Sequence, residues 1–353
     1  MSVPFFFILG RPRSGTTLLK TLFDAHPGVR IPPELPILVP LYRKFRKVKY
    51  WDAEQKQAFI DCVFRPVAFN RKRIENFGID REVFTAAVMG NDSVGSLHDM
   101  IALLNASASS FFPKSAVRLV GDKNPGYSAF ASELPRMFPE AIFICIIRDY
   151  RDNYISLRNL AGQRMEAPVL SRQVARWAIV ARQFLACVKK YPDRVRLVRY
   201  EDLVAHPREQ FAELCRFTGI PYNEEVFEFY RKKDEFMAAN PDPMVRAIHG
   251  SLMNPVNKGR TGLWKTEMTE EEVRIADQLA GRTATLLGYE RSARFSPGIW
   301  IRTLPMVMYG RLLFAVMRWG TRMPSALSNL LVIALPKLVR IYHAMRRTGR
   351  DRS

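Results

Sequence analysis

Residues Gly10 to Thr17 read Gly-Arg-Pro-Arg-Ser-Gly-Thr-Thr and follow an apolar run, Phe5–Leu9. A glycine-bounded loop between a strand and a helix can surround a phosphate, because its amides point inward and the helix N-terminus favours an anion. The loop nearly matches the nucleoside-triphosphate pattern G-x4-G-K-[ST], but Thr16 stands where the lysine would be. The cation comes earlier, at Arg13, whose planar guanidinium can bridge two oxyanions. We therefore predict a phosphate site, with the hydroxyls of Thr16 and Thr17 as further donors.

The residues downstream of the loop offer little to a magnesium ion. The nearest candidate for a magnesium-binding aspartate is Asp149, and it directly follows Arg148. No histidine pair has metal-ligand spacing, so we predict no metal. Fixed cations that stabilise a leaving phosphate suit these residues better than nucleotide hydrolysis. A P-loop nucleotide kinase or hydrolase is the alternative, and a non-catalytic nucleotide-binding protein at a membrane surface is a second one.

Four segments have the composition of short buried strands, and long helical stretches such as Gln173–Lys189 separate them. The strand segments are Phe5–Leu9, Val117–Val120, Ile142–Ile147 and Val195–Tyr200. Strands that alternate with helices predict an α/β fold, with an open parallel sheet of the P-loop type flanked by helices. Parallel sheets bind ligands at the carboxyl ends of their strands. We expect one composite site from the polar segments there, which are Gly10–Thr17, Gly121–Pro125, Arg148–Asp152 and Glu201–Asp202.

Charge is unevenly spread along the chain. The 353 residues carry a formal net charge of +20, which predicts polyanionic partners such as an anionic membrane, nucleic acid or acidic substrates. Residues 291–353 hold twelve Arg or Lys against one acid, Asp351. We therefore divide the chain into a domain at 1–290 and a basic, apolar helical extension at 291–353.

The extension is too interrupted by cations for a predicted membrane span. Its longest charge-free run, Met323–Pro336, is shorter than the ~20 apolar residues that cross a bilayer. Arg311, Arg318 and Arg322 lie on one helical face, and an apolar helix with a basic face suits an anionic membrane surface. The alternative is a helix that packs on the domain or on a second subunit of a homodimer.

A second basic segment, Tyr42–Trp51, interleaves five cations with four aromatic residues. Such a segment suits an acidic peptide, an anionic glycan or nucleic acid. The plainer interpretation is a solvated helix face with the aromatic rings buried beneath it. We favour the plainer interpretation, so nucleic acid is not an expected partner.

The cysteines and the N-terminus bear on location. The four cysteines contain no C-x-x-C pair, and Cys145 lies in a run of isoleucines, where it is expected to be a small buried apolar residue. No basic segment precedes an apolar core at the N-terminus. These features predict a reducing compartment, hence a cytoplasmic protein that is peripheral at the membrane if the extension binds lipid.

Two motifs together resemble the sulfotransferases that use 3′-phosphoadenosine 5′-phosphosulfate (PAPS). The stretch Gly10–Leu18 resembles their 5′-phosphosulfate loop, and Arg148–Ser156 resembles their 3′-phosphate motif, an arginine followed eight residues later by a serine. The resemblance implies that PAPS is the sulfuryl donor. The residues it implies for donor binding are Arg11, Pro12, Arg13, Ser14, Gly15, Thr16, Thr17, Arg148 and Ser156.

Further segments, over roughly Phe5 to Gly288, resemble the tyrosylprotein branch of that family. Asp24–Arg30 followed by Pro33-Glu34 is similar to the segment with its catalytic glutamate, although Pro32-Pro33-Glu34 replaces the usual Gly-Glu-Glu. Asp122–Pro125 resembles its strand-end lysine motif. The tyrosine that Tyr200 matches stacks on adenine. The late loop that Pro255–Arg260 resembles brings cations to the 3′-phosphate, which implies that role for Lys258, Gly259 and Arg260.

The resemblance implies in-line transfer of a sulfuryl group to a hydroxyl acceptor. Glu34 would accept the proton of the hydroxyl, and Arg13 and Lys123 would neutralise charge that develops on the transferred and leaving groups. Other branches use a histidine base, but His26 and His206 precede prolines and are expected to pack locally. The acceptor stays open among a protein tyrosine, a glycan and a lipid or small-molecule alcohol.

Overall fold

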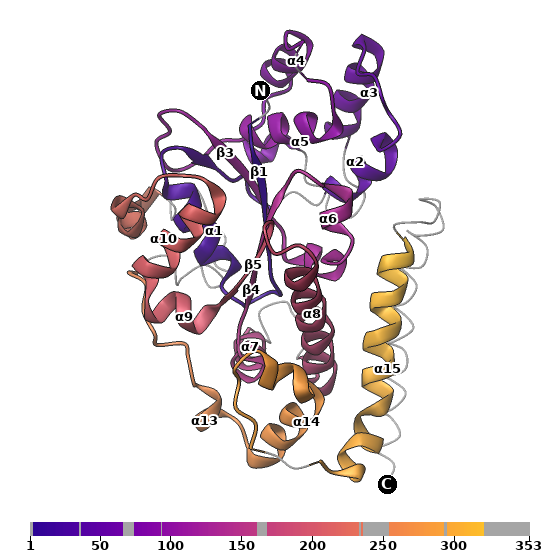
Figure 1. Cartoon of the computed structure of the whole chain (residues 1–353), viewed down its shortest axis with the longest axis vertical. Coiled ribbons are helices and arrows are strands. Elements are labelled where there is room, and N and C mark those ends of the chain that lie inside the picture. Colours follow the sequence, from indigo (N-terminus) through magenta and orange to yellow (C-terminus); the bar gives the residue numbers. More distant parts are fainter. Residues whose placement is uncertain are drawn as a thin grey trace.

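The described part of the computed structural model is built around a parallel sheet. Its five strands lie in the order β2-β3-β1-β4-β5 (Figure 1). The described residues are 3–34, 37–65, 74–92, 94–160, 168–232, 234–235, 254–292 and 295–320. The strands are β1 (Phe5–Leu9), β2 (Val29–Arg30), β3 (Leu119–Lys123), β4 (Ile142–Ile147) and β5 (Val195–Arg199). In the central strand β1, Phe7 pairs with Asp122 on one side and Phe143 on the other. The predicted α/β fold is confirmed.

Three strands differ from the sequence pattern, whereas β1 and β4 have the predicted bounds. β3 begins and ends later than predicted, because Gly121, Asp122 and Lys123 still pair with β1. β5 ends one residue earlier than predicted, since Tyr200 begins a helix. The pattern does not predict β2, because two residues are too few to show an alternation.

Helices cover both faces of the sheet. Phe6 and Ile8 of β1 point to one face and Phe5, Phe7 and Leu9 to the other. The first core lies under α1 (Thr16–Ala25), α9 (Tyr200–Ala205), α10 (Pro207–Thr218) and the 3-10 helix η3 (Glu224–Lys232). The second lies under α2 (Leu38–Phe45), α3 (Ala53–Val63), η1 (Ile74–Phe77), α4 (Arg81–Met89), α5 (Leu97–Ala106), η2 (Pro125–Phe130), α6 (Leu134–Met137) and α8 (Leu170–Lys190). Burial on both faces explains the continuously apolar β1 and β4.

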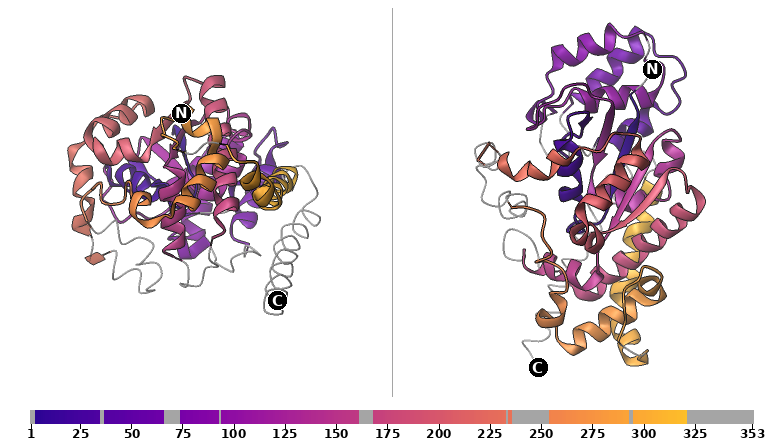
Figure 2. Two further views of the ribbon diagram at one scale, coloured as in Figure 1. Left: turned by 90° about the horizontal axis from the view of Figure 1, so that it is seen from below. Right: turned by 60° about the vertical axis from the view of Figure 1, so that its left-hand side comes forward.

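The later helices gather around α8. α7 (Tyr150–Arg158) follows β4 and contacts α13 (Trp264–Glu267), while α14 (Glu270–Leu286) packs against α8. α15 (Pro297–Gly320) runs beside α8 at the outside of the molecule (Figures 1 and 2). This confirms the predicted helical C-terminal region as far as Gly320, whereas Arg322 and Met323–Pro336 lie outside the described residues.

The length and composition of Pro297–Val316 would be enough to cross a membrane, and 17% of its most apolar window is buried. One side of α15 nevertheless packs against the rest of the protein. Phe314 is part of the core, and the Arg318 guanidinium forms an ion pair with Glu133 at 2.6 Å.

In the basic segment Tyr42–Trp51, most of the cations face solvent and most of the aromatic rings pack inward, as the plainer of the two interpretations predicts. Phe45 and Trp51 are buried and pack against one another and against Phe59. Tyr42 contacts Phe138 of the same core. The cations of the segment are mostly exposed, and Lys44 lies over the ring of Phe45 at 4.9 Å. Tyr42–Phe45 is therefore the solvated end of α2 over a core of aromatic rings, whereas Arg46–Trp51 follows the helix and its Tyr50 is 83% exposed.

Candidate active site

The loop from Gly10 to Thr17 has the backbone of an anion cradle. The amide of Ser14 donates to the carbonyl of Arg11 at 3.1 Å, which closes a turn. Arg13 and Gly15 both have positive φ, 68° and 92°, so the chain reverses sharply before α1. Gly15 precedes α1 and has no side chain to cap it, so the first-turn amides are left to a ligand.

Helix α7 fixes the outer side of this loop through Asn153, a residue that the sequence analysis did not select. The buried Asn153 amide donates to the carbonyl of Pro12 at 2.8 Å and to the hydroxyl of Ser14 at 3.3 Å. Asn153 lies within the Arg148–Ser156 motif. Its place inside a second phosphate motif was the only sequence signal that it meets the first one.

Three arginines from separate parts of the chain meet at this loop. The Arg13 Nε donates to the Ser156 hydroxyl at 3.1 Å. Arg148 donates to the carbonyl of Arg13 at 3.1 Å and to the carbonyl of Arg260. Burial, together with the charges of Arg260 and Arg148, lowers the pKa of Arg13 to about 10. The structure thus brings three of the residues predicted for the 3′-phosphate, Arg148, Ser156 and Arg260, together with Arg13 of the loop.

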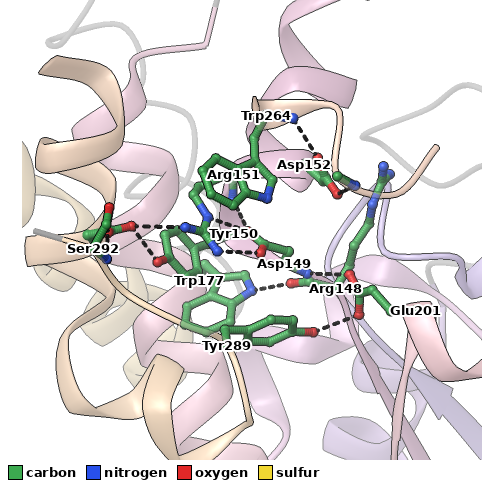
Figure 3. A network of polar contacts seen from close by, with 12 residues as sticks. Arg148, Asp149, Tyr150, Arg151, Asp152, Trp177, Glu201, Trp264, Tyr289 and Ser292 are labelled. Atoms are coloured by element: carbon green, nitrogen blue, oxygen red, sulfur yellow. Dashed lines mark hydrogen bonds and ion pairs between the residues drawn. The ribbon is translucent and has the colours of Figure 1, made fainter. Parts of the chain in front are cut away.

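The segment with Arg260 is tied down by Asp152, which the sequence analysis also passed over. The buried Asp152 carboxylate accepts from the amide of Gly262 at 2.7 Å and from that of Trp264 at 3.0 Å (Figure 3). The Trp264 ring in turn lies 3.6 Å from the Arg151 guanidinium. Lys258 and Gly259 are exposed in the same loop, and their contact with a donor stays a prediction.

Tyr200 packs against the inner side of the loop. Its ring is 7% exposed, and the Arg148 guanidinium lies 4.9 Å from its centroid. A Cβ on Gly15 would come within 2.4 Å of the same ring. The side chain therefore positions Arg148 and the loop, and its stacking on adenine stays a prediction.

Glu201, next to Tyr200, holds the ends of β4 and β5 together. Its carboxylate accepts from the amide of Asp149 at 2.9 Å and from the hydroxyl of Tyr289 at 3.0 Å (Figure 3). Trp177 of α8 donates to the Arg148 carbonyl at 2.8 Å. Arg148 thus extends from a backbone that is fixed on both sides.

Glu34 and Lys123 form an ion pair on the β3 side of the loop. Lys123 also donates to the Thr17 hydroxyl at 3.4 Å, so it connects Glu34 to the cradle. The Lys123 side chain is 4% exposed and that of Glu34 is 47% exposed. Burial lowers the pKa of Lys123, and the charge of Glu34 opposes this effect. The carboxylate is therefore held from inside the protein and open to an acceptor from outside.

Asp122 supports the segment that carries Glu34. Its carboxylate and the Tyr127 hydroxyl are hydrogen bonded, and Tyr127 also bonds to the backbone of Leu38, at the start of α2. Burial raises the pKa of Asp122 to about 7. The motif Asp122–Pro125 thus contributes a lysine to the site and a buried acid behind it.

The remaining predicted residues lie around these contacts. Thr16 and Ser14 are buried within the loop, and Pro12 is exposed. The Arg11 side chain turns away from the cradle and donates to Gln173 of α8 at 2.8 Å. His26 accepts locally from the Gly28 amide, as predicted, but it also bonds to the carbonyl of Pro221, which is distant in the sequence.

The two motifs, the lysine and the glutamate thus meet at one edge of the sheet. A family model described as "Sulfotransferase family" matches residues 4–224. The chain belongs to the sulfotransferase family. The predicted family is confirmed, and with it the assignment of the chain as a sulfotransferase enzyme.

Curated relatives of this sulfotransferase are named protein-tyrosine sulfotransferases. The one from Drosophila melanogaster is 25% identical over 322 residues, which cover 85% of this chain and 55% of the relative. Protein-tyrosine sulfotransferase 1 from Danio rerio is 24% identical, with 87% and 77% covered. The chain therefore spans little more than half the length of the first relative, and the predicted resemblance to the tyrosylprotein branch is confirmed.

Solved sulfotransferase structures show the same fold. The sulfotransferase domain from the curacin biosynthetic pathway has a TM-score of 0.52 and 21% identity, with 83% of this chain and 100% of that chain covered. The domain from the Synechococcus PCC 7002 olefin synthase has a TM-score of 0.50 and 23% identity, with 81% and 95% covered. At such identities the likeness concerns the fold alone.

Proposed function

We propose that this sulfotransferase takes its sulfuryl group from PAPS. The observation that carries the proposal is the second cationic group beside the phosphate loop, made by Arg13, Arg148 and Arg260. The charges of Arg260 and Arg148 lower the pKa of Arg13, so the three cations repel one another. A second phosphate would relieve this repulsion, and the 3′-phosphate distinguishes PAPS from ordinary adenine nucleotides.

The residues present fit this donor. The Nε of Arg148 is buried without a partner among the described residues, as expected for a guanidinium whose hydrogen-bond acceptor is a bound anion. The loop amides with Thr16 and Thr17 would hold the 5′-phosphosulfate. Ser156, Lys258, Arg148 and Arg260 would hold the 3′-phosphate. When bound, the donor supplies an activated sulfuryl group on a phosphate leaving group.

The chain's own residues then act on the acceptor. As the acceptor oxygen bonds to sulfur and the bond from sulfur to the phosphate oxygen breaks, the hydroxyl proton passes to Glu34. Lys123, buried between Glu34 and Thr17, stabilises negative charge near the bridging oxygen. Arg13 does the same from the other side of the loop. The exposed position of Glu34 leaves room for the acceptor hydroxyl.

For the acceptor we propose a hydroxyl group, in first place that of a tyrosine in a protein. The names of the relatives support tyrosine, while a glycan and a lipid or small-molecule alcohol remain as outcomes of the test. Radiolabelled PAPS incubated with host lysate, followed by separation of protein, glycan and lipid, identifies the class. Label on tyrosine supports the proposal, and label confined to glycan or lipid overturns the tyrosine assignment.

Competition between nucleotides tests the donor. We expect 3′-phosphoadenosine 5′-phosphate (PAP) to displace labelled PAPS, and ATP with magnesium to displace it far less well. Equal displacement, or tight ATP binding that depends on magnesium, would contradict a PAPS-specific site and favour a nucleotide kinase or hydrolase.

We further propose that the outer face of α15 lies on an anionic membrane surface. Ile301, Pro305, Met308, Leu312 and Ala315 are exposed and recur at helical spacing, so they form one apolar stripe along the helix. The net charge of +11 in residues 291–353 is complementary to anionic lipid. The packing of the opposite face on α8 favours a helix in the plane of the surface over one that spans it.

A further inference from the structure

A second group of arginines lies beside the donor loop, on the side that faces α8 and α15. Arg11 follows the first glycine of the loop, and its guanidinium donates to Gln173. Arg172 and Arg176 lie four residues apart, on one face of α8. The charges are close enough to act on one another, since Arg176 lowers the pKa of Arg11 and Arg172 lowers that of Arg176.

Arg11 is buried, Arg172 and Arg176 are half-buried, and none of the three forms an ion pair with a described residue. Arg11 is 5% exposed, and burial lowers its pKa to about 9. The Nε atoms of Arg11, Arg172 and Arg176 are all buried, and none has a hydrogen-bond partner among those residues. Arg11 donates to the neutral side chain of Gln173. Buried cations without an acid are costly, and a bound anion would offset that cost.

The group is separate from the cations assigned to the donor. Arg13 bonds to Ser156 of α7 and is grouped with Arg148 and Arg260 around Tyr200. Arg11, only two residues earlier, bonds to α8 instead. The ring of Phe314 on α15 lies 5.5 Å from the Arg176 guanidinium, so α15 also contacts the group. The two groups therefore lie on different sides of the same loop.

We propose that Arg11, Arg172 and Arg176 bind an oxyanion of the acceptor, a carboxylate, sulfate or phosphate, beside the hydroxyl that is sulfated. This inference rests on the proposed function, because Pro12 and Arg13 join the group directly to the donor loop. Guanidinium groups suit this task, since their planar forks bond to two oxygens at once. The acceptor is then an anionic molecule, and its charge is recognised apart from its hydroxyl.

A matched pair of acceptors and a matched pair of variants test the inference. The acceptors are 4-hydroxyphenylacetate and its uncharged amide. The variant is Arg172→Gln with Arg176→Gln, and the control is Arg182→Gln with Lys189→Gln, which removes the same charge from exposed positions of α8. We expect the first variant to raise the KM of the anionic acceptor about tenfold, with kcat and the KM of the amide unchanged. The control should behave as the wild type.

A binding measurement keeps the inference independent of turnover. With PAP at saturation, sulfate should stabilise the wild type and the control against heat at about tenfold lower concentration than it stabilises the Arg172→Gln, Arg176→Gln variant. An equal sulfate response in all three proteins would overturn the arginine site. Failure of the proposed function would instead appear as no transfer to either acceptor, with the sulfate response still dependent on Arg172 and Arg176.

Discussion

The ion pair between Glu34 and Lys123 joins a half-exposed carboxylate to a buried ammonium group. Lys123 is enclosed by the protein and keeps contact with Thr17 of the loop, whereas Glu34 is half exposed. A buried lysine keeps its charge most easily beside a carboxylate, so Glu34 stabilises the charged form of Lys123. In the proposed mechanism, this arrangement places the proton acceptor next to the charge that must be neutralised during transfer.

Replacement of Glu34 by glutamine should separate catalysis from donor binding. The glutamine carbonyl can still accept from Lys123, but it takes no proton, so we expect kcat to fall by ~10²–10⁴. The affinity for PAP should stay within about twofold, because Glu34 contacts Lys123 rather than the loop. Turnover of radiolabelled PAPS and calorimetric PAP binding measure the two effects. Glu209→Gln, at an exposed position of α10, is the control, and a normal rate in Glu34→Gln would remove the residue from its role.

The buried Asp122 predicts a pH dependence of stability. Its pKa of about 7 in the folded protein lies above the ordinary 3.8, so the unfolded chain releases this proton at lower pH than the folded one. The contribution of Asp122 to stability is therefore full below pH 4 and is lost as the pH rises toward 7. Asp122→Asn abolishes that loss, which amounts to on the order of 4 kcal/mol.

Urea unfolding at pH 5 and pH 8 measures this effect as a difference between the variant and the wild type. We expect the stability of Asp122→Asn relative to the wild type to increase from pH 5 to pH 8. A constant difference across that range would show that Asp122 does not titrate there.

At the scale of elements, the loop depends on two helices that pack against it. α7 supplies Asn153 to the loop and Asp152 to the segment after Arg260, and α9 begins with the Tyr200 ring against Gly15. The start of α7 therefore contacts both of the segments that are proposed to bind phosphate. A substitution that removes either contact should therefore weaken donor binding more than it lowers the stability of the fold.

Gly15 and Gly219 form a matched pair for testing the loop. Both have positive φ, 92° and 74°, so alanine is strained by ~1–2 kcal/mol at either position. A Cβ at Gly15 meets the Tyr200 ring at 2.4 Å, whereas a Cβ at Gly219 meets nothing within 4 Å. We expect Gly15→Ala to lose PAP binding by at least about tenfold and Gly219→Ala to retain it. Similar PAP affinities in the two variants would mean that the Tyr200 contact does not shape the loop.

Asp152 should control the segment that carries Lys258, Gly259 and Arg260. Asparagine keeps one acceptor but places an NH2 group near the Gly262 or Trp264 amide, and a lost hydrogen bond to a charged group costs ~1.5–3 kcal/mol. We expect Asp152→Asn to exchange the amide hydrogens of Gly262 and Trp264 faster and to bind PAP about tenfold more weakly. The exposed Asp193→Asn is the control, and unchanged exchange would argue against an anchor.

At the scale of the whole molecule, the parallel sheet could be predicted from sequence, because strands such as Ile142–Ile147 are apolar without interruption. The meeting of Gly10–Thr17 with Arg148–Ser156 could also be predicted, because both follow strands of that sheet. Asn153 and Asp152 could not be selected, since their roles depend on segments 100 or more residues away that meet only in the fold. For Arg11, the direction of the side chain could not be predicted from sequence either. Its place in the loop suggested donor binding, yet the side chain bonds to α8.

The exposed apolar stripe of α15 predicts that the whole molecule binds to an anionic membrane surface. The wild type should sediment with vesicles that contain anionic lipid and not with purely zwitterionic ones, and added salt should weaken binding. Met308→Glu with Leu312→Glu places two acids on the exposed stripe, where each side chain is 53% and 54% exposed, so the fold is spared. Each acid should cost ~1 kcal/mol near an anionic surface, besides the lost apolar contact.

Val83→Glu with Leu286→Glu is the matched control, because both residues are exposed and apolar and lie on α4 and α14. We expect this control to bind vesicles as the wild type does. A second copy of the chain is the rival occupant of the stripe, and sedimentation without lipid distinguishes it. Dimers that the Met308→Glu, Leu312→Glu variant dissociates, together with equal binding of all proteins to vesicles, would assign the stripe to a subunit interface and overturn the membrane proposal.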